Sequence, residues 1–232
     1  PSWRHSRSAT SVENPLEETT SFAYDENGNQ ASVTAPGGQV TAYGYDANNR
    51  LASVEADAAG IAATTAYAYD AAGNRTAITD AEGHATQFAY DALGRLASEQ
   101  DAIGKTEFYA YDAVGNLTSR TNGSGQTVGY AYDALGRQTR VDHPEGTASH
   151  LAYDGNGNLT AAWDPSEAHA LEYDANNRLV RRTIVGVGSI DYEYDLAGRR
   201  TRVTDWSGAS VAYTYDKRGL VTQVVSPAGT SQ

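Results

Sequence analysis

The acidic side chains are the first candidates for chemistry in this sequence. The chain of 232 residues holds 29 Asp and Glu against 17 Lys and Arg, which gives a formal net charge of -12. Two carboxyl groups that flank a bond, one of them with a raised pKa, form the acid and base of a glycosidase. Here the aspartates recur at regular intervals, and none stands in a setting unlike that of its copies. We therefore expect no catalytic pair and no enzymatic activity.

Metal binding is the second chemistry that the acidic residues could support. Residues 25–29 and 154–158 are rich in Asp, Asn and Gly, but they lack the spaced acidic ligands and the final Glu of an EF-hand. The five histidines show no zinc spacing, the chain has no cysteine, and no serine stands in a nucleophile-elbow context. Tight turns explain these loops better, and we expect neither a metal ion nor a cofactor.

Positive charge is concentrated in one part of the chain, between residues 178 and 202. This cluster is a candidate contact patch for acidic cargo, a glycan or another protein segment. The alternative is a solvated face whose charge is neutralised by nearby carboxylates. The members of the cluster are Arg178, Arg181, Arg182, Arg199, Arg200 and Arg202.

The secondary structure that must position these side chains follows from a sequence repeat of about 21 residues. Ten Tyr-Asp pairs, from Tyr24-Asp25 to Tyr215-Asp216, follow one another at intervals of 20, 21 or 24 residues. A period of this length indicates a repeat architecture, in which each unit must stack on its neighbours to bury its apolar face. We predict an array of about ten repeats over residues 21–232. Residues 1–20 have no Tyr-Asp pair and form a non-repeat lead-in or the remnant of a preceding repeat.

Each repeat is predicted to contain two β-strands and two turns. Residues 106–111 combine β-formers with aromatic side chains at every second position, and residues 117–121 form a second strand. The third residue after each repeat Asp is always Gly or Asn, which tolerate positive φ, and the Asp can accept a hydrogen bond from the backbone two residues on. This pattern predicts a type I turn with a G1 bulge. The residues given this structural role include Tyr45, Asp46, Tyr69, Asp70, Gly73, Tyr90, Asp91, Gly94, Tyr111, Asp112, Gly115, Tyr132, Asp133, Gly136, Tyr194, Asp195 and Gly198.

The repeated hairpins predict an all-β fold. They would form one long antiparallel, coiled sheet, either an open shell or a barrel-like ribbon, because each strand is twisted against the next. The repeat tyrosines would line one face, and small residues such as Ala110 and Ala131 the other. Large aliphatic side chains are sparse, so we favour a single layer with one surface lining a cavity. A two-layer sandwich is the alternative.

The composition excludes several classes of partner. The acidic balance would repel a nucleic-acid backbone, and no apolar run approaches the roughly 18 residues of a membrane helix. The absence of cysteine excludes disulfides and thiolate sites. The chain lacks methionine and begins with Pro1, so we expect it to be a piece of a longer polypeptide.

Units such as residues 90–96 and 132–137 closely resemble the repeats of the Rhs/YD-repeat family, and the resemblance extends over residues 22–229. The resemblance implies a spiralling β-shell that encloses a toxic C-terminal domain in bacterial polymorphic toxins and insecticidal toxin complexes; animal teneurins carry a similar shell and act in cell adhesion. The family's autoproteolytic segment has no counterpart here, so no cleavage residue is carried over.

The family resemblance thus implies a non-catalytic structural shell segment that is secreted or at the cell surface. Its partners would be the remainder of the shell and an encapsulated toxin domain. The alternative is an extracellular module for carbohydrate binding or cell adhesion, which would use exposed tyrosines to bind cell-surface glycans. The orientation of the tyrosine rings distinguishes the two, because packed rings favour the shell and an exposed stripe favours the binding module.

Overall fold

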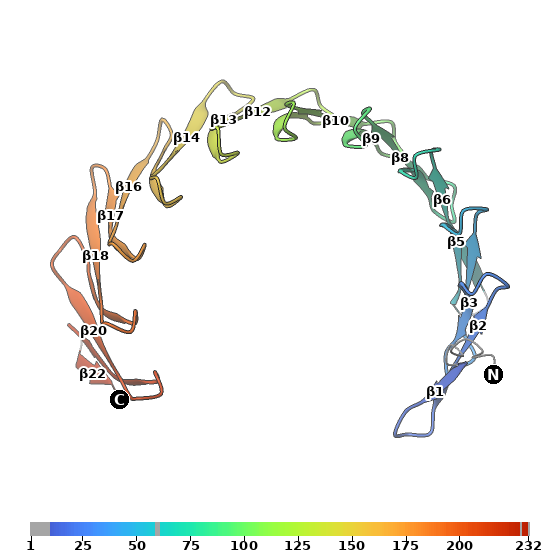
Figure 1. The fold of residues 1–232 in the computed structure, drawn as a ribbon, viewed down its shortest axis with the longest axis horizontal. Coiled ribbons are helices and arrows are strands. Elements are labelled where there is room, and N and C mark those ends of the chain that lie inside the picture. Colours follow the sequence, from blue (N-terminus) through green and yellow to red (C-terminus); the bar gives the residue numbers. More distant parts are fainter. Residues whose placement is uncertain (1–9, 59–60, 228, 232) are drawn as a thin grey trace, which may run out of the picture. The chain divides into compact units, whose positions relative to one another are not determined.

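The computed structural model describes residues 10–58, 61–227 and 229–231. It divides into two compact units: unit 1 contains the chain up to Tyr109 together with residues 122–124, and unit 2 contains residues 110–121 and the chain from Gly125 onward. All regular structure in the described ranges is β-strand, and they contain no helix that could cross a membrane. The predicted all-β fold is confirmed (Figure 1).

Unit 1 is a series of antiparallel strands in which each strand pairs with the next along the chain. The last two residues of its final strand belong to unit 2. The strands are β1 (Ser11–Glu13), β2 (Thr19–Tyr24), β3 (Gln30–Thr34), β4 (Val40–Tyr45), β5 (Leu51–Ala58), β6 (Ile61–Tyr69), β7 (Arg75–Thr79), β8 (Ala85–Tyr90), β9 (Leu96–Gln100) and β10 (Thr106–Tyr111).

Unit 2 has the same organisation, with consecutive strands paired antiparallel. Its strands are β11 (Leu117–Thr121), β12 (Thr127–Tyr132), β13 (Gln138–Asp142), β14 (Ala148–Tyr153), β15 (Leu159–Trp163), β16 (Ala168–Tyr173), β17 (Leu179–Ile184), β18 (Gly188–Tyr194), β19 (Arg200–Thr204), β20 (Ser210–Tyr215), β21 (Val221–Ser226) and β22 (Gly229–Ser231).

The turn after each Tyr-Asp pair has the predicted geometry. At the third position after Asp133, Gly136 has a φ of +76°, and its N–H donates to the carbonyl of Asp133 at 3.0 Å. The pairing of β12 with β13 shifts by one residue just before Tyr132, which is the bulge expected beside a left-handed residue. Where Asn replaces Gly, at Asn49 and Asn177, φ is +59°. The prediction of a turn with a left-handed Gly or Asn is therefore confirmed.

The two faces of the sheet carry different side chains, as the alternation of tyrosine and small residues along the strands predicts. In β12 the rings of Tyr130 and Tyr132 are half-buried, whereas Ala131 between them is exposed, and β10 shows the same alternation. We call these the tyrosine face and the alanine face. No described side chain of either unit is fully buried, so neither unit has a packed core. Each unit is a single layer, as predicted, and the sandwich alternative is wrong.

The predicted lead-in, residues 1–20, is described only from residue 10. Its strand β1 pairs with β2, as in the contact of Val12 with Thr20. The turn between them is capped by Asn14, whose Oδ1 accepts the N–H groups of Leu16 and Glu18 at 2.9 and 3.0 Å. The lead-in therefore contains a capped hairpin before the first Tyr-Asp pair.

Candidate functional site

Each repeat aspartate caps its own turn. The Oδ1 of Asp133 accepts the backbone N–H groups of Leu135 and Arg137 at 2.9 and 3.0 Å. These bonds favour the carboxylate, and the N–H of Arg137, followed by its guanidinium, holds the pKa of Asp133 below its usual value. At Asp154 the side-chain amide of Asn158 is the main cause of the lowered pKa. A glycosidase acid needs a raised pKa, so these carboxylates are poorly suited to that role.

The repeat tyrosine contacts the preceding repeat. The Tyr194 hydroxyl donates to the carbonyl oxygen of Leu179 at 2.8 Å, beyond the last pair of the β17–β18 ladder at Arg181 and Asp191. The hydroxyl thus satisfies a backbone carbonyl that the ladder leaves without a partner. The same bond is made by Tyr45, Tyr69, Tyr90, Tyr153, Tyr173 and Tyr215.

In several repeats an arginine four residues after the repeat Asp links the turn to the next repeat, and we call this arrangement the staple. In Arg178, Nη2 lies 2.6 Å from Oδ2 of Asp174 in its own turn. Its Nη1 donates to the carbonyl of Asp195 at 3.0 Å, and the guanidinium carbon lies 4.8 Å from the centre of the Tyr194 ring. Arg178 therefore combines an ion pair, a hydrogen bond and a cation–π contact, the last two with the following repeat.

The same three contacts are made by the equivalent arginine of three other repeats. These arginines are Arg50, Arg137 and Arg199, with guanidinium-to-ring distances of 4.6, 4.7 and 4.8 Å. Asn can also link two repeats: the Nδ2 of Asn158 donates to Oδ1 of Asn177 at 2.9 Å. This role was not predicted from the sequence, although the Arg that follows Gly or Asn in several repeats is a visible signal.

The structure divides the candidate arginine patch between two faces. Arg178 and Arg199 are held in staples, and Arg182 lies on the tyrosine face with its Nη2 3.4 Å from Nδ1 of His169. Arg200 lies between two rings of the tyrosine face, those of Tyr192 and Tyr213, at 5.9 and 5.7 Å.

The other two arginines of the patch lie on the alanine face. There Arg181 pairs with Asp191 at 2.6 Å, and Arg202 lies 3.7 Å from Glu193. The six side chains therefore do not form one continuous basic surface.

One group in the described ranges has ligand atoms close enough to hold a metal ion. The candidate ligand atoms of Asp80, Glu82 and His84 lie within 4.8 Å of one another in the turn between β7 and β8. All three side chains are exposed, and Nδ1 of His84 lies 3.1 Å from Asp80 and 3.4 Å from Glu82. Contacts within the turn account for this cluster.

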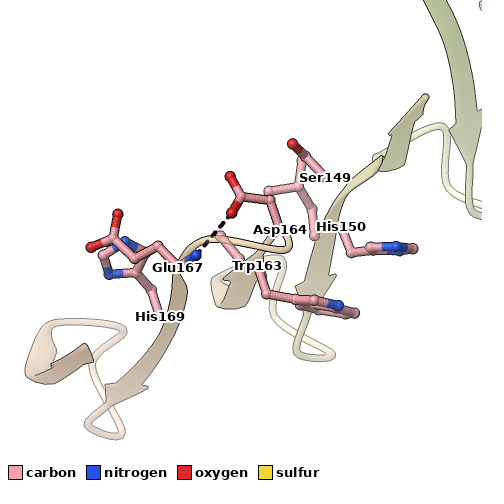
Figure 2. Close-up of a pocket in the computed structure, with 8 residues that line it drawn as sticks. Ser149, His150, Trp163, Asp164, Glu167 and His169 are labelled. Atoms are coloured by element: carbon pink, nitrogen blue, oxygen red, sulfur yellow. Dashed lines mark hydrogen bonds and ion pairs between the residues drawn. The ribbon is translucent and has the colours of Figure 1, made fainter. Parts of the chain in front are cut away.

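An irregular hairpin of unit 2 joins β15 to β16. Its turn, residues 164–167, is one residue shorter than the usual second turn, and Oδ1 of Asp164 accepts the N–H groups of Ser166 and Glu167 at 2.7 and 2.9 Å. The Ser166 side chain is the main cause of the lowered pKa of Asp164. A shallow hollow of about 150 Å³ adjoins this turn and is lined by Ser149, His150, Leu151, Ala162, Trp163, Asp164, Glu167 and His169. Figure 2 shows Ser149 and Asp164 on one side of the strands and the rings of His150 and Trp163 on the other.

A second hollow beside this turn contains a serine–histidine pair. Nε2 of His143 lies 2.9 Å from Oγ of Ser149, a distance that a nucleophilic serine and its base require. Side-chain contacts across the strands also close other second hairpins, such as Gln100 with Thr106 at 3.0 Å. The pair is therefore accounted for as a cross-strand contact of the hairpin.

Comparison with solved structures identifies the architecture. A crystal structure of TcdB2-TccC3-Cdc42 aligns over 94% of this chain with a TM-score of 0.56 and 15% identity. The Tc holotoxin pore of Photorhabdus luminescens aligns over 96% with a TM-score of 0.56 and 15% identity, and TcdB2-TccC3 without its hypervariable C-terminal region over 92% with 0.57 and 16%. At this identity the likeness concerns the fold, and the chain spans only 15–16% of the length of those chains.

Family models agree with the structural comparison. No curated protein sequence matches the chain. The Teneurin YD-shell model matches residues 64–171, and the RHS repeat model matches residues 9–40, 24–62, 153–190, 173–210 and 194–231, together more than half of the chain. With its Tyr-Asp turns, linked hairpins and single-layer sheet, the chain belongs to the Rhs/YD-repeat family.

Proposed function

We propose that this chain is a non-catalytic segment of a YD-repeat shell that encloses a toxin polypeptide for delivery outside the producing cell. The observation that supports this proposal most directly is the staple, because the Asp, Arg and Tyr side chains of the repeat hold neighbouring hairpins together. Arg178, for example, contacts its own turn and the next repeat at once. A shell encloses its cargo only if its sheet is continuous, which explains why the Asp, Arg and Tyr side chains of the repeat bind neighbouring repeats to one another.

The orientation of the tyrosines favours the shell over a tyrosine-based adhesion module. The rings of Tyr153, Tyr173 and Tyr194 are half-buried on their face, and each hydroxyl donates to a backbone carbonyl. Rings used in this way leave little surface for a sugar or a cell-surface protein. A toxin is the cargo class that we propose because the structural neighbours include a holotoxin pore and a chain described by its hypervariable C-terminal region.

Protease protection tests this function in the natural polypeptide that carries residues 1–232. Thermolysin digestion should cleave the C-terminal cargo slowly in the native protein and about 10-fold faster when Arg137, Arg178 and Arg199 are all replaced by Met. The matched control replaces Arg140, Arg181 and Arg202, which lie on the alanine face and carry the same total charge. A native cargo cleaved as fast as an isolated cargo would refute the proposal.

A further inference from the structure

The alanine face of unit 2 carries an exposed aromatic platform at the irregular hairpin. The ring of Trp163 is stacked on that of His150, with ring centres 4.9 Å apart and planes 9° from parallel. The two residues are directly paired across β14 and β15, so His150 covers one side of the indole. Trp163 is nevertheless 41% exposed. Figure 2 shows the two rings side by side, on the opposite side of the strands from Ser149 and Asp164.

The uncovered side of the indole is turned toward a very small residue. Trp163 pairs with Ala168 on the next strand, which contributes only a methyl group. Beyond Ala168 lies Val185, whose N–H donates to the carbonyl of Ala168 at 2.9 Å and whose side chain is 65% exposed. Adjacent strands lie about 4.8 Å apart, so Trp163 and Val185 are separated by about 10 Å, which leaves about 5 to 6 Å between their surfaces. A chair-shaped sugar ring has about this thickness, whereas a flat aromatic ring is thinner.

Polar groups border this platform on the same face. Two residues along the strand from Ala168, and on the same face, Ala170 pairs with Thr183 of β17. Thr183 in turn pairs with Ser189 of β18. In the next row, Arg181 is paired with Asp191 at 2.6 Å. An apolar surface followed by hydroxyl groups and then by a donor–acceptor pair matches a ligand with one apolar side and a rim of hydroxyls.

The charges of this face favour a neutral ligand. Arg181 is matched by Asp191, Arg140 by Asp142 at 2.6 Å, and Arg202 lies 3.7 Å from Glu193. Each guanidinium already has a carboxylate beside it, and Arg181 is also paired with Glu172 on β16, so the face offers hydrogen-bond donors and acceptors without a surplus of positive charge. An anionic phosphate would have to displace one of these carboxylates.

We infer that this face holds a saccharide site, in which a neutral pyranose stacks on the free side of Trp163 above Ala168. The hydroxyls of the sugar point toward Thr183, Ser189 and the Arg181–Asp191 pair. A pyranose with equatorial hydroxyls fits best, because its axial C–H groups form two apolar sides, one for the indole and one for Val185. This inference goes beyond the shell role and does not depend on it.

The test follows the indole N–H signal of Trp163 by NMR while cellohexaose is added, with Trp206 as an internal reference. A single stacked ring should bind weakly, with a Kd of about 1 mM, and should shift the Trp163 signal alone. Ala168→Leu fills the space beside the indole without removing an aromatic ring and should weaken binding at least about 10-fold. Thr183→Val, a nearly isosteric change, should weaken it about 3-fold.

Matched controls make each outcome decisive. Trp206→Phe should leave the affinity unchanged, and mannohexaose, whose rings carry an axial hydroxyl, should bind more weakly than cellohexaose. The proposal is overturned if the Trp163 signal does not respond to about 20 mM cellohexaose, well above the expected Kd. It is equally overturned if a folded Ala168→Leu variant binds as tightly as the native chain, or if a tyrosine-containing peptide shifts Trp163 and cellohexaose does not.

Discussion

Replacing Arg178 by Met tests whether the staple stabilises the sheet. The change retains the unbranched side-chain stem but removes the guanidinium, and with it the 3.0 Å hydrogen bond to the carbonyl of Asp195 and the contact 4.8 Å above the Tyr194 ring. The ion pair with Asp174 is also lost, although both side chains remain partly exposed, at 27% and 22%.

The expected cost follows from these contacts. A hydrogen bond from a charged donor to a half-buried carbonyl contributes about 1 kcal/mol, and a partly exposed cation–π contact contributes about 0.5 to 1 kcal/mol. We assign only a few tenths of a kcal/mol to the partly exposed ion pair. Together these contributions predict a loss of about 2 kcal/mol for Arg178→Met, whereas Arg181→Met removes one surface pair and should cost less than about 0.5 kcal/mol.

Urea unfolding, followed by far-UV circular dichroism, measures this difference. With a denaturant slope of about 2 kcal/mol per molar, the midpoint of Arg178→Met should fall by about 1 M, and that of Arg181→Met by about 0.2 M. Because arrays of repeats can unfold locally, amide exchange should also be faster in β17 and β18 of the first variant. Equal midpoints for the two variants would show that the staple contributes nothing beyond an ordinary surface ion pair.

Three further predictions concern the tyrosine hydroxyl, a crowded glycine and the turn carboxylates. Tyr194→Phe leaves a carbonyl without its donor and should cost about 1 kcal/mol in urea, whereas Tyr192→Phe, whose hydroxyl has no hydrogen-bond partner among the described residues, should cost little; equal losses would contradict this role. Gly188→Ala adds a Cβ that overlaps that of Trp206 at a φ of +146° and should lower the thermal midpoint, which Trp206→Gly, but not Trp206→Ala, should partly restore because only glycine lacks a Cβ; no recovery with glycine would exclude crowding as the cause. The N–H of Arg50, followed by its guanidinium, lowers the pKa of Asp46 in the folded state, so stability should be full above pH ~4 and fall as pH drops through the folded value; a thermal midpoint that is flat down to pH ~2 would refute this.

The turn chemistry made the fold predictable from the sequence. Gly136, three residues after Asp133, carries information that depends only on local backbone geometry, because few residues adopt its φ of +76°. Tyr130 and Tyr132 likewise revealed the period of two that separates the faces of a strand. Once such a unit recurs ten times, consecutive pairing of the strands follows.

The contacts between repeats could not be read in the same way. Arg178 contacts Asp195, 17 residues later, and only the register of β17 and β18 brings them together. From the sequence alone, Arg178 is therefore grouped with Arg181 in a candidate contact patch, although the structure puts the two in different surroundings. The stacking of Trp163 on His150 likewise depends on the pairing of β14 with β15, which a list of residues does not contain.

The direction of the staple affects how the protein assembles during synthesis. The guanidinium of Arg178 reaches forward to the next repeat, and the hydroxyl of Tyr194 reaches back to Leu179, so both bonds form only when the later repeat is present. A hairpin that has just left the ribosome must therefore wait for the following Tyr-Asp pair to be translated. The chain would mature from its amino end, with a single unsecured hairpin at the growing front, and a pause in translation would leave only that hairpin vulnerable to proteases.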